Sequence, residues 1–113
     1  MDLNLIVIAG RVAAQPELRT FESGSALMRL LITVRSSAPR RRVDVIPVSV
    51  WEPDDELLGG AISVGTGLWI AGAVQRRFWS ATDGRRSRLE VVAHEVSIRS
   101  ADETAEGNGL STV

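Results

Sequence analysis

Two apolar segments near the start of the chain are joined by Gly10-Arg11-Val12-Ala13-Ala14-Gln15-Pro16-Glu17-Leu18-Arg19, and a turn signal, Ser23-Gly24, follows. The first segment, Leu3 to Val12, is a nearly continuous apolar run. The second, Leu27 to Arg35, alternates apolar and polar residues, which is typical of a strand with one buried face. This part of the sequence therefore predicts two strands and a connection that ends in a tight turn.

Three more strands are predicted at Val43 to Trp51, Leu68 to Trp79 and Arg88 to Arg99. Successive side chains of a strand point to opposite faces, so each of the first two strands has an inward and an outward set. The outward set of the earlier strand is Val45, Pro47, Ser49 and Trp51. The outward set of the later strand is Trp69, Gln75, Arg77 and Trp79. The same alternation places Phe78 toward the core.

Turn-forming and strand-breaking residues indicate how these strands are connected and which of them lies at an edge. Asp83-Gly84 predicts a hairpin between the last two, because glycine tolerates the positive φ of tight turns. Pro47 cannot donate a ladder hydrogen bond, so its strand must be an edge there or carry a bulge. Asp54 to Ile62 is the one helix candidate, weakened by Gly59-Gly60. The predicted fold is all-β, an OB-fold: a five-stranded Greek-key barrel with one short helix between strands 3 and 4.

The composition excludes several classes of protein. A chain of 113 residues with 44% hydrophobic residues fits one compact domain. It has no apolar run near the roughly 18 residues that span a bilayer and no signal peptide at Met1, so we expect a cytoplasmic protein. There is no cysteine, and the single histidine, His94, has no suitable partner for acid-base or metal chemistry. We therefore expect no catalytic residue, no metal and no cofactor.

The net charge of −1 hides a segregated distribution of charges. All 13 basic residues are arginine, which a GC-rich coding bias would also produce. They include two clusters, Arg35 with Arg40 to Arg42 and Arg76 to Arg88, while acids gather at Glu52 to Glu56 and in the tail. Arginine forms bidentate contacts with phosphate and stacks on bases. The clusters therefore favour a nucleic-acid ligand over simple solvation.

The Gly-Arg and Pro-Glu-Leu-Arg elements, the Ser-Gly turn and three later motifs together resemble the bacterial single-stranded DNA-binding proteins. The later motifs are Val48-Ser49-Val50-Trp51, Gly72-Ala73-Val74-Gln75-Arg76-Arg77-Phe78-Trp79 and Leu89-Glu90-Val91-Val92-Ala93. The similarity covers about residues 3 to 99. It implies an OB-fold that binds single-stranded DNA in replication, recombination or repair, without catalysis and largely without reading sequence.

The expected binding residues are outward aromatics that stack on bases and arginines that track the phosphates. The resemblance places Trp51 and Trp79 where the family's aromatics stack, although either could instead lie in the core or an interface. It also places Arg40 to Arg42 and Arg85 with Arg86 in the two loops that close on single strands in the family. The expected set is Trp51, Trp79, Arg35, Arg40, Arg41, Arg42, Gln75, Arg77, Arg85 and Arg86. For Trp69 we favour packing between subunits over contact with DNA.

The resemblance also implies a homo-oligomer, with a homotetramer favoured, and a location with the nucleoid. Residues 1–99 form the expected binding domain and 100–113 a short flexible tail. The tail lacks the acidic tip by which family members recruit other enzymes, so we expect either a short paralogue without that role or a sequence truncated before the tip. The outward positions before Trp51, at Val45 and Pro47, carry no aromatic side chain, so fewer bases can stack. The affinity for DNA should therefore depend more on charge contacts and on salt concentration. The alternative is an OB-fold assembly module, similar to a primosomal accessory protein, whose main partner is a protein.

Overall fold

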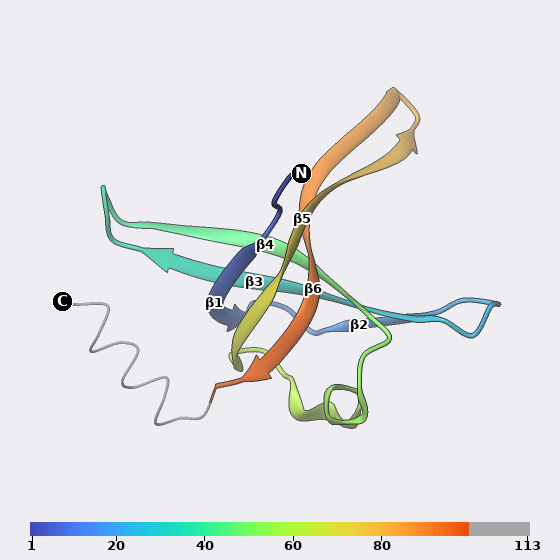
Figure 1. Cartoon of the computed structure of the whole chain (residues 1–113), viewed down its shortest axis with the longest axis horizontal. Helices are drawn as coiled ribbons and strands as arrows, with labels where there is room; N and C mark the ends of the chain where they lie inside the picture. Colours follow the sequence, from blue (N-terminus) through green and yellow to red (C-terminus); the bar gives the residue numbers. More distant parts are fainter. Residues whose placement is uncertain (100–113) are drawn as a thin grey trace.

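The computed structural model describes residues 1–99, so the expected tail at 100–113 lies outside the described residues (Figure 1). The described part is dominated by strands, with one short helical segment after the fourth. The elements are β1 (Ile6–Val12), β2 (Glu17–Thr20), β3 (Ala26–Ser36), β4 (Arg42–Trp51), η1 (Leu57–Ala61), β5 (Gly67–Ala81) and β6 (Gly84–Ile98). Within this part of the chain, no helix is long and apolar enough to cross a membrane.

Five of the strands close into a barrel. β1 pairs antiparallel with β5 along its length and with β3 at its end, through Arg11 opposite Thr33. β4 and β6 run parallel and meet at two residue pairs, Val48 with Val91 and Ser49 with Val92. The strands therefore follow one another around the barrel as β1, β3, β4, β6, β5 and back to β1. This closure confirms the predicted OB-fold, and β2 is an additional short strand on the outer edge of β3.

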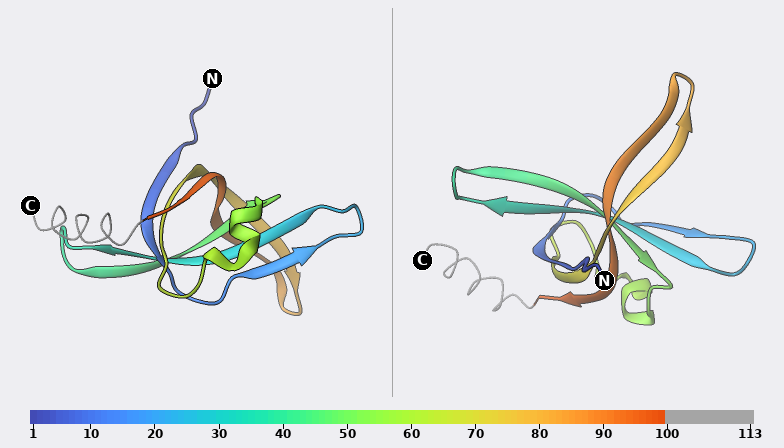
Figure 2. Two further views of the ribbon diagram at one scale, coloured as in Figure 1. Left: turned by 90° about the horizontal axis from the view of Figure 1, so that it is seen from below. Right: turned by 45° about the horizontal axis from the view of Figure 1, so that its top comes forward.

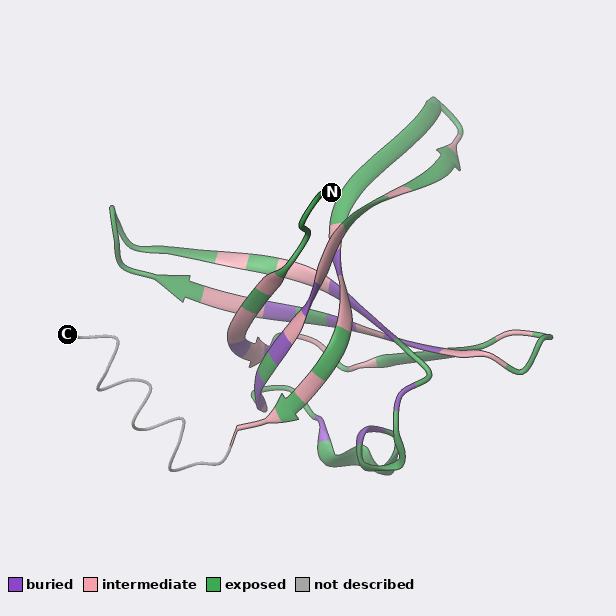
Figure 3. Ribbon diagram, in the orientation of Figure 1, coloured by how far each residue is buried: buried purple, intermediate pink, exposed green. Residues whose placement is uncertain are grey.

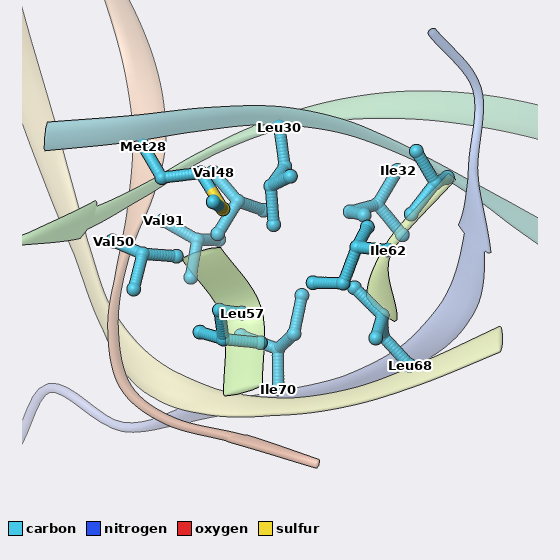
Figure 4. Packing of buried hydrophobic residues seen from close by; sticks show 11 residues of the cluster. Met28, Leu30, Ile32, Val48, Val50, Leu57, Ile62, Leu68, Ile70 and Val91 are labelled. Carbon is cyan, nitrogen blue, oxygen red and sulfur yellow. The ribbon is translucent and has the colours of Figure 1, made fainter. Parts of the chain in front are cut away.

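The core lies inside this barrel and consists of aliphatic side chains and one methionine (Figures 3 and 4). It is supplied by one face of each barrel strand, as the alternation predicts. Its buried members are Val12, Met28, Leu30, Ile32, Val48, Val50, Leu57, Ile62, Leu68, Ile70 and Val91. Leu57 is the first residue of η1 and Ile62 follows its last residue, and both side chains cover one end of the barrel (Figure 4).

The helix is shorter than the predicted Asp54 to Ile62. The Asp54 side chain accepts a hydrogen bond from the Leu57 backbone N–H at 3.0 Å, which supports the first turn. Gly60 then leaves the helical region at φ 84°, so the segment ends at Ala61. The glycine pair that weakens the helix in the sequence therefore also ends it.

The edge predicted at Pro47 is confirmed. Pro47 lies opposite Leu31 of β3, and β4 meets β6 only from Val48 onward. On the side of β4 that faces β6, Pro47 has no partner strand within residues 1–99. The N–H that proline lacks is therefore not needed for pairing between strands. The pairing of β3 with β4 runs without a register shift.

Three hairpins extend outward from the barrel and expose most of their outer residues (Figures 2 and 3). They are formed by β2 with β3, β3 with β4, and β5 with β6. The last, which we call the β5–β6 arm, comprises residues 75–90; its strands pair up to Ala81 opposite Gly84. Gly84 has a φ of 125°, as the predicted turn requires. The arm places the arginines of the second cluster beyond the core.

Gly72 occupies a tight point between β5 and β6, next to a register shift at Ala71. A Cβ built on Gly72 would collide with the carbonyl group of Val92 and lie 3.0 Å from the Cα of Ala93. All of these atoms belong to the backbone, so they cannot move aside as a flexible side chain would. We therefore expect Gly72→Ala to lower the free energy of unfolding by about 2 kcal/mol, measured by denaturant titration.

The matched control is Gly59→Ala, because nothing lies within 4 Å of a Cβ at that position. It should be neutral or slightly stabilising, since alanine restricts the unfolded chain more than glycine does. Equal stability of the two variants would contradict the close strand packing at Gly72.

Candidate nucleic-acid interface

A positively charged hollow opens on the outer surface where β3, β5 and β6 meet. It has a volume of about 350 Å³ and is lined by Arg29, Arg77, Trp79 and Arg88. Arg77 and Arg88 are direct cross-strand partners. Like charges in such positions repel each other unless an anion lies between them. The hollow thus combines an aromatic ring with three cations and has no carboxylate in its lining.

Trp79 supplies the aromatic surface of this hollow. Its position on the outward face is as the alternation predicts, and the residue is 42% exposed. The Arg88 guanidinium carbon lies 6.0 Å from the Trp79 ring centroid, at the outer limit of a cation–π contact. Gln75 lies two residues before Arg77 and therefore on the same face of β5. A flat ring beside mobile cations can accept the face of a nucleobase and its phosphate together.

Arg29 belongs to this site although the sequence analysis did not select it. It lies on the outer face of β3, opposite Ser49 of β4 and Glu17 of β2. Its Nε is buried and has no hydrogen-bond partner within residues 1–99. A buried donor without a partner carries a desolvation cost that an incoming acceptor would relieve. Alternation does place Arg29 outward, but only the barrel closure brings it beside Trp79.

A second hollow adjoins the first and shares Arg29 and Arg88 with it. Ser49 lies in its lining, on the outward face of β4 as the alternation predicts, but it is only 3% exposed. The reason is that β4 pairs with both β3 and β6 at this residue. The adjoining hollow extends the site across the barrel toward β2 and also includes the carboxylates of Glu17 and Glu90.

Trp51 is the second predicted stacking residue, and it is 49% exposed at the end of β4. The Phe21 ring stacks against it, with centroids 5.7 Å apart and an interplanar angle of 26°. The Arg19 guanidinium carbon in turn lies 5.2 Å from the Phe21 centroid. One face of the Trp51 ring is therefore covered by this column. Phe21 was not identified from the sequence, because it lies in a turn where alternation gives no orientation.

The arginines near the tip of the β3–β4 hairpin fall into two groups. Arg35, Arg40 and Arg41 are exposed and form no ion pair within the described part of the chain. Arg42 instead forms a bidentate contact with Asp44, with N–O distances of 2.9 and 2.7 Å. This hydrogen bonding lowers the pKa of Asp44 and raises the pKa of Arg42. Three of these four arginines can thus reach a phosphate without first breaking an internal pair.

The tip of the β5–β6 arm separates two arginines that the sequence grouped together. Adjacent residues of a strand point to opposite faces, so Arg85 and Arg86 lie on different faces of the arm. Arg86 lies on the Trp79 face and pairs with Asp83. Arg85 lies on the other face, with its guanidinium carbon 4.5 Å from the Phe78 ring centroid.

The prediction that Phe78 is buried is wrong, since the residue is 51% exposed. Phe78 does share the face of β5 that points inward within the barrel, because it is four residues beyond Val74. At Phe78, however, the strand has already left the barrel and only Ser87 lies opposite. The alternation thus predicts the correct face of β5 for Phe78 but wrongly predicts that the residue is buried.

Trp69 lies apart from the hollow, at the other end of β5, opposite Ala9 of β1. It is exposed, with the Arg99 guanidinium carbon 5.0 Å from its ring centroid. Within residues 1–99, no group of three or more histidine, cysteine, aspartate or glutamate side chains is arranged to hold a metal ion.

Comparisons with known proteins agree on one family. The model of the single-strand binding protein family matches residues 3–99. A single-stranded DNA-binding protein from Clostridium tetani is 36% identical over 99 residues, which cover 83% of this chain and 68% of that protein. One from Thermosynechococcus vestitus is 28% identical over 112 residues, covering 97% of this chain and 93% of that protein. The fold is similar to that of a Plasmodium falciparum SSB solved in complex with ssDNA, with a TM-score of 0.77 and 15% identity over 88% of this chain and 97% of that one.

Proposed function

The chain belongs to the single-strand binding protein family, and from that premise we propose that it binds and protects single-stranded DNA, without catalysis and largely without reading sequence. The observation that carries this proposal is the outer hollow in which Trp79 lies beside Arg29, Arg77 and Arg88. A single strand exposes both the faces of its bases and its phosphates, and this hollow offers a partner to each.

The bases would stack on Trp79 and on the uncovered face of Trp51, while arginines hold the phosphates between them. Stacking is tolerant of sequence because every base has a flat face. Arg29 and Arg88 would act at the centre of the site, since they line both adjoining hollows. Arg35, Arg40 and Arg41 would extend the contact along the β3–β4 hairpin, and Gln75 would add a neutral hydrogen-bonding group beside Arg77.

This function is tested by gel retardation of oligo-dT and of a duplex of the same length at low salt. We expect the protein to retard the single strand at concentrations that leave the duplex free. A protein that retards neither nucleic acid would refute the proposal and favour an OB-fold module whose main partner is another protein.

We further propose that the protein acts as a homo-oligomer, with a homotetramer favoured, in the cytoplasm and associated with the nucleoid. In support, the outer face of β1 and β5 carries exposed apolar side chains at Leu5, Val7 and Trp69. Large exposed apolar patches on soluble proteins commonly mark protein contacts. Sedimentation equilibrium should give four times the mass of the chain, and the mass of a single chain would refute the assembly.

Replacing Asp44 by asparagine should strengthen binding. The Asp44 carboxylate accepts both hydrogen bonds from Arg42, and it would compete with phosphate for that guanidinium. We expect Asp44→Asn to tighten binding of oligo-dT by about threefold at low salt, since one more phosphate contact becomes available. Fluorescence anisotropy of labelled oligo-dT measures the change.

The control for this prediction is Asp55→Asn, which removes the same charge from an exposed residue outside the loop. If the two variants gain affinity equally, the effect comes from net charge, and Arg42 does not contact DNA.

A further inference from the structure

The β5–β6 arm has no partner strand along its edges within residues 1–99. The pairing of β5 with β1 ends at Gly72, and the pairing of β6 with β4 ends at Val91. The Asn4 side chain then exchanges two hydrogen bonds with the backbone of Val74, at 2.7 and 2.8 Å. Beyond that residue the two strands pair only with each other within the described part of the chain, and the end of the arm stands clear of the barrel (Figure 2).

One face of this arm carries Trp79, Arg77 and Arg88 and belongs to the site described above. The opposite face has the same chemistry. Its residues on the two strands are Arg76, Phe78, Ser80, Arg85, Ser87 and Leu89. This set includes an exposed aromatic ring, two arginines and no carboxylate. We call it the Phe78 face.

The contacts on the Phe78 face parallel those on the Trp79 face. The Arg85 guanidinium carbon lies 4.5 Å from the Phe78 centroid, as Arg88 lies 6.0 Å from that of Trp79. Arg76 donates a hydrogen bond of 3.1 Å to the Ser87 hydroxyl, which holds its guanidinium across the strands. Phe78 is outside the core cluster, so packing in the core formed by residues 1–99 does not account for its ring.

We propose that the Phe78 face is a second surface for single-stranded DNA, on which Phe78 stacks against a base and Arg76 and Arg85 contact phosphates. This inference rests on the proposed function. Neighbouring strands are only about 4.8 Å apart, so a two-stranded arm is narrow enough for one DNA strand to pass around its edge. A strand bound first on the Trp79 face then continues onto the Phe78 face.

Charge favours nucleic acid over protein as the occupant. Two arginines without a neighbouring carboxylate are complementary to a phosphate chain, whose neutralisation releases counterions.

The test compares Phe78→Leu with Trp79→Leu on two lengths of oligo-dT. A strand of about 8 nucleotides should occupy the Trp79 face alone, because that face has more arginines, while a strand of about 40 should reach both. Leucine keeps apolar bulk for any protein contact but removes the flat ring. We expect Phe78→Leu to bind the short strand within about twofold of wild type and the long strand about tenfold more weakly, with fewer nucleotides occluded. Trp79→Leu should weaken both.

Two results would overturn the inference. If Phe78→Leu and Phe78→Ala bind the long strand like wild type, with the same occluded length, Phe78 forms only a surface pair with Arg85. If Phe78→Ala instead changes the oligomeric mass while binding is retained, the face is a protein interface. Failure of the wild-type protein to bind either length refutes the proposed function itself, so the two failures are distinguishable. Thermal melting of each variant shows that it is folded.

Discussion

Raising the salt concentration tenfold is expected to weaken binding of oligo-dT roughly 16,000-fold. For single strands the slope of log affinity against log salt is about −0.7 for each phosphate neutralised, so the six arginine contacts proposed above give a slope of about −4.2. Arg29, Arg77 and Arg88 line the central hollow, and the loop between β3 and β4 adds exposed arginines. The measurement is a set of anisotropy titrations at several salt concentrations.

Single arginine variants serve as the controls for that slope. Arg88→Gln and Arg29→Gln should each make the slope shallower by about 0.7, because each removes one phosphate contact. Arg19→Gln should leave it unchanged, since that guanidinium lies against Phe21. A slope near zero for the wild-type protein would show that phosphates contribute little and that the hollow has another ligand.

Replacing Trp79 by alanine is expected to weaken binding by up to about 3 kcal/mol, the upper range for loss of one stacked base. Trp79 is half-exposed on the arm and is not a member of the core, so the fold should be retained. The effect should exceed that of Trp51→Ala, because Phe21 already covers one face of the Trp51 ring. Titration of oligo-dT at fixed salt measures both losses.

Trp79→Phe is the matched control, because phenylalanine keeps a flat ring and should recover most of the affinity. If phenylalanine and alanine at this position give equal affinities, the ring of Trp79 does not stack on a base. If Trp51→Ala is the more damaging substitution, the centre of the site lies at the β2–β3 hairpin instead.

The barrel could be predicted because its strands follow a period of two and are separated by clear turn signals. Met28, Leu30 and Ile32 point inward as that period requires, and Gly84 adopts the positive φ that the hairpin needs. The short strand β2 was missed because all four of its residues are exposed. A strand on an outer edge has no hydrophobic pattern, and only its backbone pairing with β3 reveals it.

The outward orientation of Trp51 and Trp79 was also predictable, but their surroundings were not. Arg29 joins Trp79 only because β3 and β6 both pair with β4, which no local pattern encodes. Phe78 was misplaced because alternation gives the face of a strand but not the point at which the strand leaves the core. The pair of Arg42 with Asp44 follows a local rule that was not applied, since residues two apart on a strand share a face.

The central claim is that Trp79 stacks on the bases of single-stranded DNA, and a protein with one tryptophan tests it most directly. Trp51→Phe combined with Trp69→Phe leaves Trp79 as the only tryptophan of the chain. Titration with oligo-dT should quench its fluorescence strongly at low salt and less at high salt, as binding weakens. Retarded oligo-dT with unchanged Trp79 fluorescence would contradict the account, because DNA would then bind without contact with this ring.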